Sequence, residues 1–434
     1  MTVLHCCVQL WYKLHILLLV TLLHMLDKIE MRIPVDASLV EIDSEGKYCI
    51  CGIDLLDLSI KTASREVYKD ENDLIHHQLL HHPYSSLPTS YTKMAFKFFH
   101  DGNTWPYVEL KASPAKILQG HNVFGSDNIR EGAFEMFGWL LESHPDLYSL
   151  LHIESTEVML FDVTYSIRLK DNDMVDKVLS FMRNFSSRGI RKNTDRAATF
   201  KNTVYLGSSR GKWLARKLYG KACEFADQLG EQKKLALKND KSAQRVVAVM
   251  EDPRLQAWVQ GLLRIETGMK KAWFQKLGIP TKLFQLIEYQ DKNPNFLQEL
   301  WVKANEEMFK GLEGQMMKTT DHDSVYKNIC SRFQTITPRG KVSLTKARNV
   351  FNFYCALELH GCEVLKKKYS ERQYYQYMAD LLSAGFSKAF LQNLNSDVKN
   401  NVIPFIKLVE MKFDQQLPDW YVPPVSSFRF KQSA

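Results

Sequence analysis

The sequence lacks the features of a zinc protein, a membrane protein or a repeat protein. Its eight cysteines are scattered without the paired spacing of a zinc site, as in a reducing compartment. One apolar run, at 16–23, has eight residues and is too short to cross a bilayer, and no small-residue cleavage site follows it. We therefore interpret residues 1–24 as an apolar leader or an upstream-start extension before Met25. No internal repeat or low-complexity tract is present.

Acidic residues are almost absent from one segment. Between Arg183 and Lys221 there are 11 Lys or Arg residues and one acid, although the whole chain has a net charge of only +8. Basic groups neutralise phosphates and the interleaved aromatic rings can stack on unpaired bases, so this composition favours DNA, single strands especially. A solvated face is the alternative. The predicted DNA contacts are Arg210, Lys212, Arg216 and Lys217, with Arg264 and the turn residues His121 and Asn122.

The same basic segment contains a candidate nucleophile. Tyr219 lies two residues before Lys221, after a turn rich in Gly, Ser and Arg at 207–211. Lys221 would favour the phenolate, because the usual tyrosine pKa of about 10 is too high for attack at neutral pH. Such a phenolate could attack a DNA phosphodiester and keep the strand covalently attached. Tyr205 is the competing nucleophile, and a core tyrosine among solvated lysines is the alternative without chemistry.

Three acids lie in apolar surroundings, where a carboxylate is costly to bury unless it is paired or binds a metal. They are Glu109 in YVELK, Asp162 in LFDVTYS and Glu266 in LLRIETGMK. Oxygen ligands that converge on one sheet suit Mg²⁺, which keeps waters and a substrate phosphate in its other positions. Ion pairs with neighbouring basic residues are the alternative. The histidines at 76–82 precede Pro83 without a nearby acidic motif, so we expect a loop there and no metal site.

The hydrophobic pattern divides the chain into two regions. Residues 25–280 alternate between strand-like segments and helical ones, which predicts an α+β domain on a largely antiparallel sheet. From 281 to 434 the pattern becomes one of amphipathic helices, which predicts an all-helical DNA-binding or accessory domain. Within it, residues 370–394 resemble a helix–turn–helix.

Several segments carry a resemblance to a known family. They are LPTSYTKMAFKFF at 87–99, VELKASPAKILQGHNVFG at 108–125, GLLRIETGMKKAWFQKLGIP at 261–280 and LPDWY at 417–421. Together they resemble the replication initiators of filamentous phages, over residues from about 25 to 421. The patterns TVYLGS, LYGK and LLRIE are also similar to those of plasmid rolling-circle initiators, in which a tyrosine is the nucleophile.

The resemblance implies a Mg²⁺-dependent, site-specific endonuclease with strand-joining, topoisomerase-like activity. Such proteins nick the viral plus-strand origin in supercoiled double-stranded DNA, and later cleave and circularise the displaced single strand. Host helicase and DNA polymerase would be the partners, in the host cytoplasm and without a membrane. A family habit of internal initiation would place a second start at Met317. The His-hydrophobe-His metal motif of many rolling-circle enzymes is absent, so metal binding by the three acids is inferred from the residues alone.

Two other functions remain compatible with the same residues. One is a non-catalytic origin-binding regulator, which would bind DNA without Mg²⁺-dependent cleavage. The other is a metal-only hydrolytic nuclease without a covalent intermediate, whose cleavage would survive both Tyr219→Phe and Tyr205→Phe.

Overall fold

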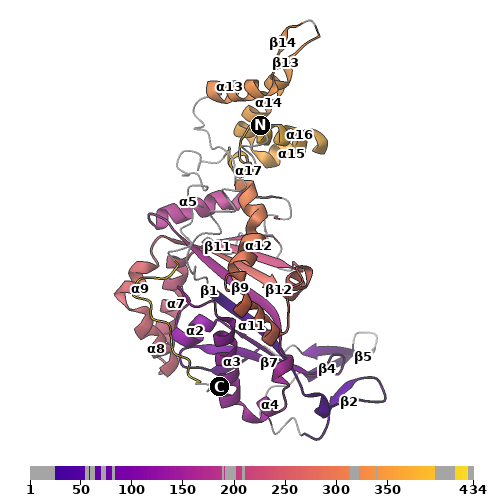
Figure 1. Cartoon of the computed structure of the whole chain (residues 1–434), viewed down its shortest axis with the longest axis vertical. Coiled ribbons are helices and arrows are strands. Elements are labelled where there is room, and N and C mark those ends of the chain that lie inside the picture. The colour runs from indigo at the N-terminus through magenta and orange to yellow at the C-terminus, as the bar shows by residue number, and fades with distance from the viewer. Residues whose placement is uncertain are drawn as a thin grey trace.

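The computed structural model describes most of the chain as a sheet-based domain followed by a group of helices (Figure 1). The described residues are 25–53, 58, 64–69, 75–80, 84–187, 190, 202–207, 211–312, 322–338, 340–395 and 416–428. The predicted α+β class is confirmed. Met317 and the leader at 1–24 lie outside the described residues. No helix within the described ranges is long and apolar enough to cross a membrane.

An eight-stranded sheet forms the centre of the first domain. Its strands follow the order β10-β11-β12-β9-β1-β8-β7-β6, and each neighbouring pair is antiparallel. The strands are β1 (Met25–Pro34), β6 (Ser85–Pro88), β7 (Lys93–Phe99), β8 (Tyr107–Ala112), β9 (Glu157–Arg168), β10 (Thr203–Leu206), β11 (Leu214–Gly220) and β12 (Leu262–Lys270). Two hairpins are paired separately: β2 (Val40–Ile42) with β3 (Tyr48–Ile50), and β4 (Ser64–Lys69) with β5 (Ile75–Leu80).

Apolar residues alternate along the strands, and this alternation explains why one face of the sheet is buried in the hydrophobic core. In β1 the side chains of Leu26, Ile29, Met31 and Ile33 are buried and belong to the main core. The core also includes helices on this side of the sheet. They are α3 (Ile129–Ser143), α5 (Asn172–Arg183), α10 (Lys271–Lys276), α11 (Leu283–Lys292) and α12 (Phe296–Leu312).

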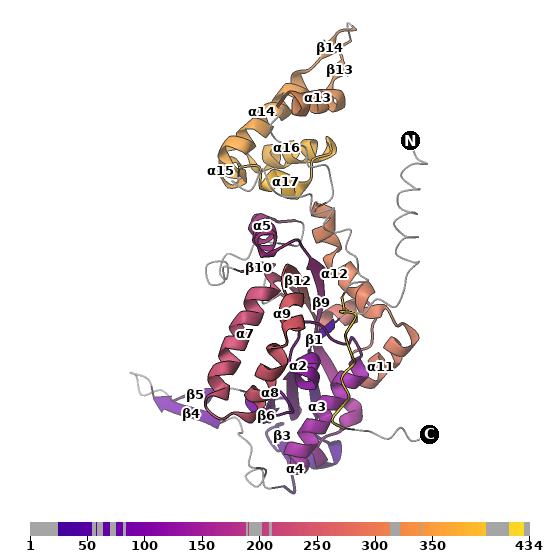
Figure 2. The same cartoon turned by 90° about the vertical axis from the view of Figure 1, so that its left-hand side faces the viewer.

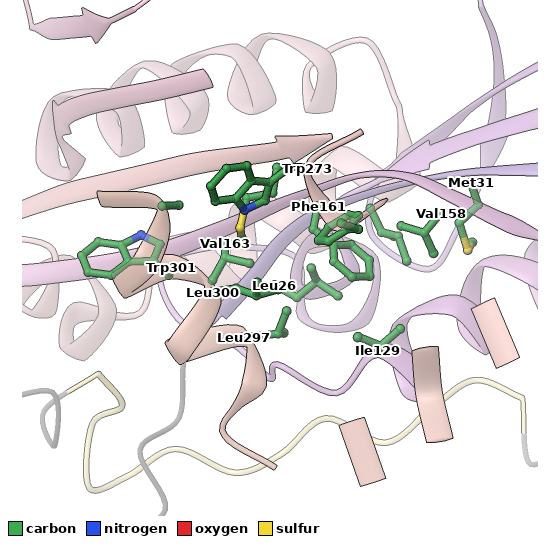
Figure 3. Close-up of a cluster of buried hydrophobic side chains, with 14 of the residues drawn as sticks. Leu26, Met31, Ile129, Val158, Phe161, Val163, Trp273, Leu297, Leu300 and Trp301 are labelled. Atoms are coloured by element: carbon green, nitrogen blue, oxygen red, sulfur yellow. The ribbon is translucent and has the colours of Figure 1, made fainter. Parts of the chain in front are cut away.

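Helix α12 packs directly on the central strands. Figure 3 shows Leu297, Leu300 and Trp301 of α12 beside Phe161 and Val163 of β9. Helices α11 and α12 therefore share the core of the sheet domain, beyond the predicted boundary at residue 280.

The other side of the sheet carries a second group of helices and a smaller apolar cluster. These helices are α7 (Lys221–Ala236), α8 (Lys241–Met250) and α9 (Pro253–Trp258). Helix α2 (Pro114–Gln119) instead contributes Ile117 and Leu118 to the main core. Figure 2 shows α7 and α8 on the side of the sheet opposite α11 and α12. Short segments α4 (Pro145–Ser149), η1 (Ala37–Leu39) and η2 (Ile153–Ser155) connect the larger elements.

The C-terminal helices have a core of their own. They are α13 (His322–Phe333), α14 (Thr345–His360), α15 (Cys362–Lys368), α16 (Glu371–Ser383) and α17 (Lys388–Gln392). The prediction of helices alone misses one short hairpin, β13 (Thr335–Ile336) with β14 (Val342–Ser343). The helix–turn–helix candidate corresponds to α16 and α17. Because α17 has five residues, buries Ala389 to Leu391 and packs on α12, it has no free face for a DNA groove.

Candidate functional site

Three neighbouring strands bring five of the predicted site residues together on the side of the sheet that faces α7: Asp162, Lys217, Tyr219, Arg264 and Glu266. Across β11 and β12, Lys217 is paired with Glu266 and Tyr219 with Arg264. Across β12 and β9, Gly268 is paired with Asp162. Residues directly opposite one another in adjacent strands point to the same face, so segments distant in sequence meet here.

A cavity of about 270 Å³ opens at this place in the sheet. Its lining includes both Asp162 and Glu266, together with Lys217 and Tyr205. Gly268 leaves room for the Asp162 side chain, because a Cβ added there would lie 2.6 Å from Asp162 Oδ1. The cavity therefore contains two of the three carboxylates that the sequence predicts as metal ligands.

The two carboxylates are held in an unfavourable electrostatic environment. Burial, together with the nearby Asp27 and Asp162, raises the pKa of Glu266 to about 8, although Lys217 lies 2.7 Å from Glu266 Oε1 and opposes the shift. Burial also raises the pKa of Asp162 to about 6, with Lys28 opposing it. Carboxylates in this condition gain free energy from any additional cation that enters the cavity.

These residues fit Mg²⁺ better than they fit a metal with an all-protein ligand set. Within the described ranges, no group of three or more His, Cys, Asp or Glu side chains converges on one point. Mg²⁺ needs only one or two carboxylates, because it keeps several waters and takes substrate phosphates as ligands. His76 and His77 lie in strand β5 and not in the predicted loop, because they pair with β4. Their side chains, and His81 and His82, lie outside the described residues.

Tyr219 lies beside this cavity and is directed at Glu266. Its hydroxyl donates a hydrogen bond of 3.3 Å to Glu266 Oε2, and the residue is 6% exposed. Burial raises the pKa of Tyr219 well above its usual value, and the charge of Arg264 partly opposes the shift. The phenol is therefore protonated at neutral pH, and Glu266, which faces its hydroxyl, can accept the proton only in its ionised form.

Lys221 does not occupy the predicted place beside the phenol. Its ammonium is completely buried, donates a 2.8 Å hydrogen bond to Asn122 Oδ1 and forms an ion pair with Glu224. Burial lowers the pKa of Lys221 to about 7, and Arg264 contributes to the shift. Lys221 is the first residue of helix α7, and its side chain is directed towards Asn122. The positive charge that acts to lower the pKa of Tyr219 is therefore that of Arg264.

Asp27 is part of the site although its sequence context did not single it out. A register shift between Leu26 and Lys28 in β1 leaves Asp27 as an extra residue, and its Oδ1 accepts a 2.7 Å hydrogen bond from Asn122 Nδ2. Burial opposes its ionisation, but Arg264 and the lysine of α7 keep the pKa of Asp27 below its usual value. The available signal was an acid within the apolar alternation of MLDKIEMRIP, the criterion that identified the other carboxylates.

The predicted DNA contacts in the GHN turn are internal. The Arg264 guanidinium donates 2.6 Å hydrogen bonds to the carbonyl oxygens of Asn122 and Val123. The His121 Nδ1 accepts from the Val123 N–H at 3.2 Å, and burial, with the charges of Lys221 and Arg264, lowers the pKa of His121 to about 3. Since all of these side chains are buried, the turn organises the site and presents none of them to a DNA surface.

Glu109 lies in a separate cluster and does not join the other two carboxylates. Its oxygens are paired with Arg32 at 2.7 Å and Lys111 at 2.8 Å, and accept a hydrogen bond from Tyr84. Glu109 is on β8, beyond β1, so two strands separate it from β12. The predicted third metal ligand is therefore already neutralised by ion pairs elsewhere on the sheet.

The basic segment is only partly available to DNA. Arg216 projects from the face opposite Lys217, and its Nε donates a 3.0 Å hydrogen bond to the Ala304 carbonyl of α12. Lys212 is exposed, next to Trp213, which is 43% exposed with Lys276 4.1 Å above its ring. Arg210 lies outside the described residues.

Comparison with known proteins matches the chain to a recognised family. The N-terminal family of the phage replication-associated protein, the gene II protein, matches residues 25–293, and the corresponding C-terminal family matches residues 336–427. The replication-associated protein of Salmonella phage IKe is 34% identical over 418 residues, which are 93% of this chain and 97% of the relative. That of Enterobacteria phage M13 is 32% identical over 416 residues, 92% of this chain and 99% of the relative. No solved structure matches the chain.

Proposed function

The chain belongs to the replication-associated protein family of filamentous phages, and from this we propose that it nicks the viral plus-strand origin in supercoiled double-stranded DNA. It then cleaves the displaced single strand and joins its ends into a circle. The observation that carries the proposal is the hydrogen bond from the Tyr219 hydroxyl to Glu266 at the wall of the cavity. This contact pairs a nucleophile with a base at a site where two carboxylates face a space open to DNA.

The chemistry follows from that pair. The Tyr219 oxygen attacks the scissile phosphorus while its proton passes to the ionised form of Glu266, which the charge of Lys217 favours, and the bond from phosphorus to the 3′ oxygen breaks. The 3′ oxygen leaves with a proton from water, and the 5′ end stays on the tyrosine, as the family resemblance implies. Arg264 stabilises the negative charge that develops on the phenol oxygen. Rejoining is the reverse displacement by a 3′ hydroxyl, and it needs no ATP because one phosphoester bond replaces another.

The cavity provides the place for a divalent cation. Asp162 and Glu266 are the side chains that would hold Mg²⁺ there. When bound, the ion would withdraw charge from a phosphate oxygen and so favour attack on the phosphorus.

The DNA would approach the site near the start of β11, which Lys212 and Trp213 precede. Lys212 is exposed and Lys217 lines the cavity, so both can neutralise backbone phosphates. The exposed ring of Trp213 offers a stacking surface for an unpaired base once the origin opens. Host helicase and DNA polymerase would then act on the nicked product in the host cytoplasm.

A nicking assay on a supercoiled plasmid that carries the cognate origin, with Mg²⁺, tests the proposal. We expect Tyr219→Phe to abolish nicking while origin binding persists, because the change removes one hydroxyl from a buried side chain. The matched control is Tyr205→Phe, which alters the other tyrosine at the cavity and should nick like the wild type.

Other outcomes identify the competing functions. Loss of nicking in Tyr205→Phe alone would transfer the nucleophile to that residue. Full nicking in both variants would indicate a metal-only hydrolytic nuclease. Origin binding without any wild-type cleavage would indicate a non-catalytic regulator.

A further inference from the structure

The C-terminal segment 416–428, here called the strap, lies against the sheet domain. Figure 2 shows it, in yellow, running along the side of this domain and past α3, far from the helices that precede it in sequence. Three sets of contacts attach it, and two of them adjoin the residues around Tyr219.

The first attachment completes the edge of β9. Gln416 accepts a hydrogen bond from the Ser166 N–H and donates one to the Ser166 carbonyl, both 2.9 Å long. Within the described residues, β1 pairs with β9 as far as Met25 opposite Thr164. Gln416 satisfies the backbone N–H and carbonyl groups of Ser166, two residues further along β9.

The second attachment supports the turn that binds Arg264. The rings of Trp420 and Tyr421 both contact Phe124 edge-on, with centroids 5.4 Å apart in each pair. Phe124 directly follows the two residues whose carbonyls accept the hydrogen bonds of Arg264. A shift of the Phe124 ring would therefore move the acceptors of the Arg264 guanidinium.

The strap also lies directly behind the site. Gln416 and Leu417 line a small cavity of about 10 Å³ together with Thr164 and Arg264. Arg264 is buried and is paired across the strands with Tyr219. The strap and Arg264 therefore line the same small cavity.

The third attachment shows that docking of the strap is built into the fold. Glu135 of α3 is fully buried, and its Oε2 accepts hydrogen bonds from the Ser426 hydroxyl at 2.6 Å and the Ser427 N–H at 3.1 Å. Phe428 contacts α3 at Gly138, where an added Cβ would overlap its ring. Without the strap, a buried carboxylate would lose two of its hydrogen-bond donors, at a substantial cost in free energy.

We propose that the strap is a positioning element of the nicking site, which holds the turn at 121–125 so that Arg264 stays aligned with Tyr219. This inference rests on the proposed function. Gln416 and Trp420 act through the turn and through β9, and contact neither the nucleophile nor the cavity carboxylates. The C-terminal family region therefore contributes to the chemistry of the N-terminal one.

Two full-length variants test the strap from its opposite ends. Gln416→Ala removes both hydrogen bonds to β9, and Gly138→Ala displaces Phe428 from α3. The matched control is Gly230→Ala in α7, where nothing lies within 4 Å of the added Cβ. The measurements are the nicking rate constant at saturating protein, the Kd for origin DNA and the thermal unfolding midpoint.

We expect Gln416→Ala to lower the nicking rate constant by about 10- to 100-fold with an unchanged Kd, since small misplacements of catalytic groups have effects of this size. Gly138→Ala should lower it in the same direction, and Gly230→Ala should match the wild type. Wild-type rate constants in both strap variants would overturn the proposal, and so would equal losses of rate and DNA affinity. If the wild-type protein itself does not nick, the result refutes the proposed function and not the role of the strap.

Discussion

Replacement of Lys221 by methionine should stabilise the protein at acidic pH. The Lys221 ammonium is completely enclosed, and burial lowers its pKa from 10.5 to about 7. Burial also opposes ionisation of Glu224, yet the charge and the hydrogen bond of Lys221 keep the pKa of Glu224 below its usual value. The ammonium thus loses more hydration free energy on burial than its interactions with Asn122 and Glu224 provide.

The sign and size of the effect follow from proton linkage. The unfolded chain keeps the ordinary lysine pKa, so below pH 7 the folded protein pays the full cost of a buried charge. A drop from 10.5 to about 7 corresponds to about 5 kcal/mol. Lys221→Met removes this cost and loses hydrogen bonds worth about 1–2 kcal/mol. We therefore expect a gain of about 3 kcal/mol at pH 6 that falls towards zero by pH 9, as the wild-type amine becomes neutral.

Urea unfolding at pH 6, 7.5 and 9 measures this difference. The control is Lys233→Met in the same helix, because Lys233 is half exposed and pairs with Glu251 at 2.8 Å on the surface. Its free energy of unfolding should change by less than about 0.5 kcal/mol, without a trend in pH. A Lys221→Met protein that is less stable than the wild type at pH 6 would refute the reasoning, since its buried contacts would then outweigh the lost hydration.

Two further substitutions test the division between the cavity and the second ionic cluster. Gly268→Ala places a Cβ 2.6 Å from Asp162 Oδ1, so the carboxylate must move and the nicking rate should fall by about tenfold or more. An unchanged nicking rate would show that Asp162 has no role in nicking. Glu109→Gln should lower the free energy of unfolding by about 1–3 kcal/mol, because Arg32 and Lys111 lose a buried anion, and should leave the nicking rate unchanged. A loss of nicking without a loss of stability would instead indicate that Glu109 is a metal ligand, as the sequence predicts.

The amino-acid sequence by itself determined the class of fold and much of the site. Apolar alternation is a local property, so it predicted the antiparallel sheet and the helical C-terminal region before any contact was known. An acid within an apolar strand must have a partner, and this rule selected Asp162 and Glu266, which the fold brings to one cavity. The sequence patterns also indicated the family to which the chain belongs.

Only the tertiary structure decided which charges meet. The order of the strands separates Glu109 from the cavity, and a bulge in β1 brings Asp27 to Asn122. The start of α7 directs Lys221 away from Tyr219, although only Gly220 lies between them in the chain. The strap reaches the site from more than a hundred residues beyond β12. These contacts depend on strand register, on the face to which each side chain points and on how the C-terminal segment folds back onto the sheet domain. A local pattern of residue types specifies none of these.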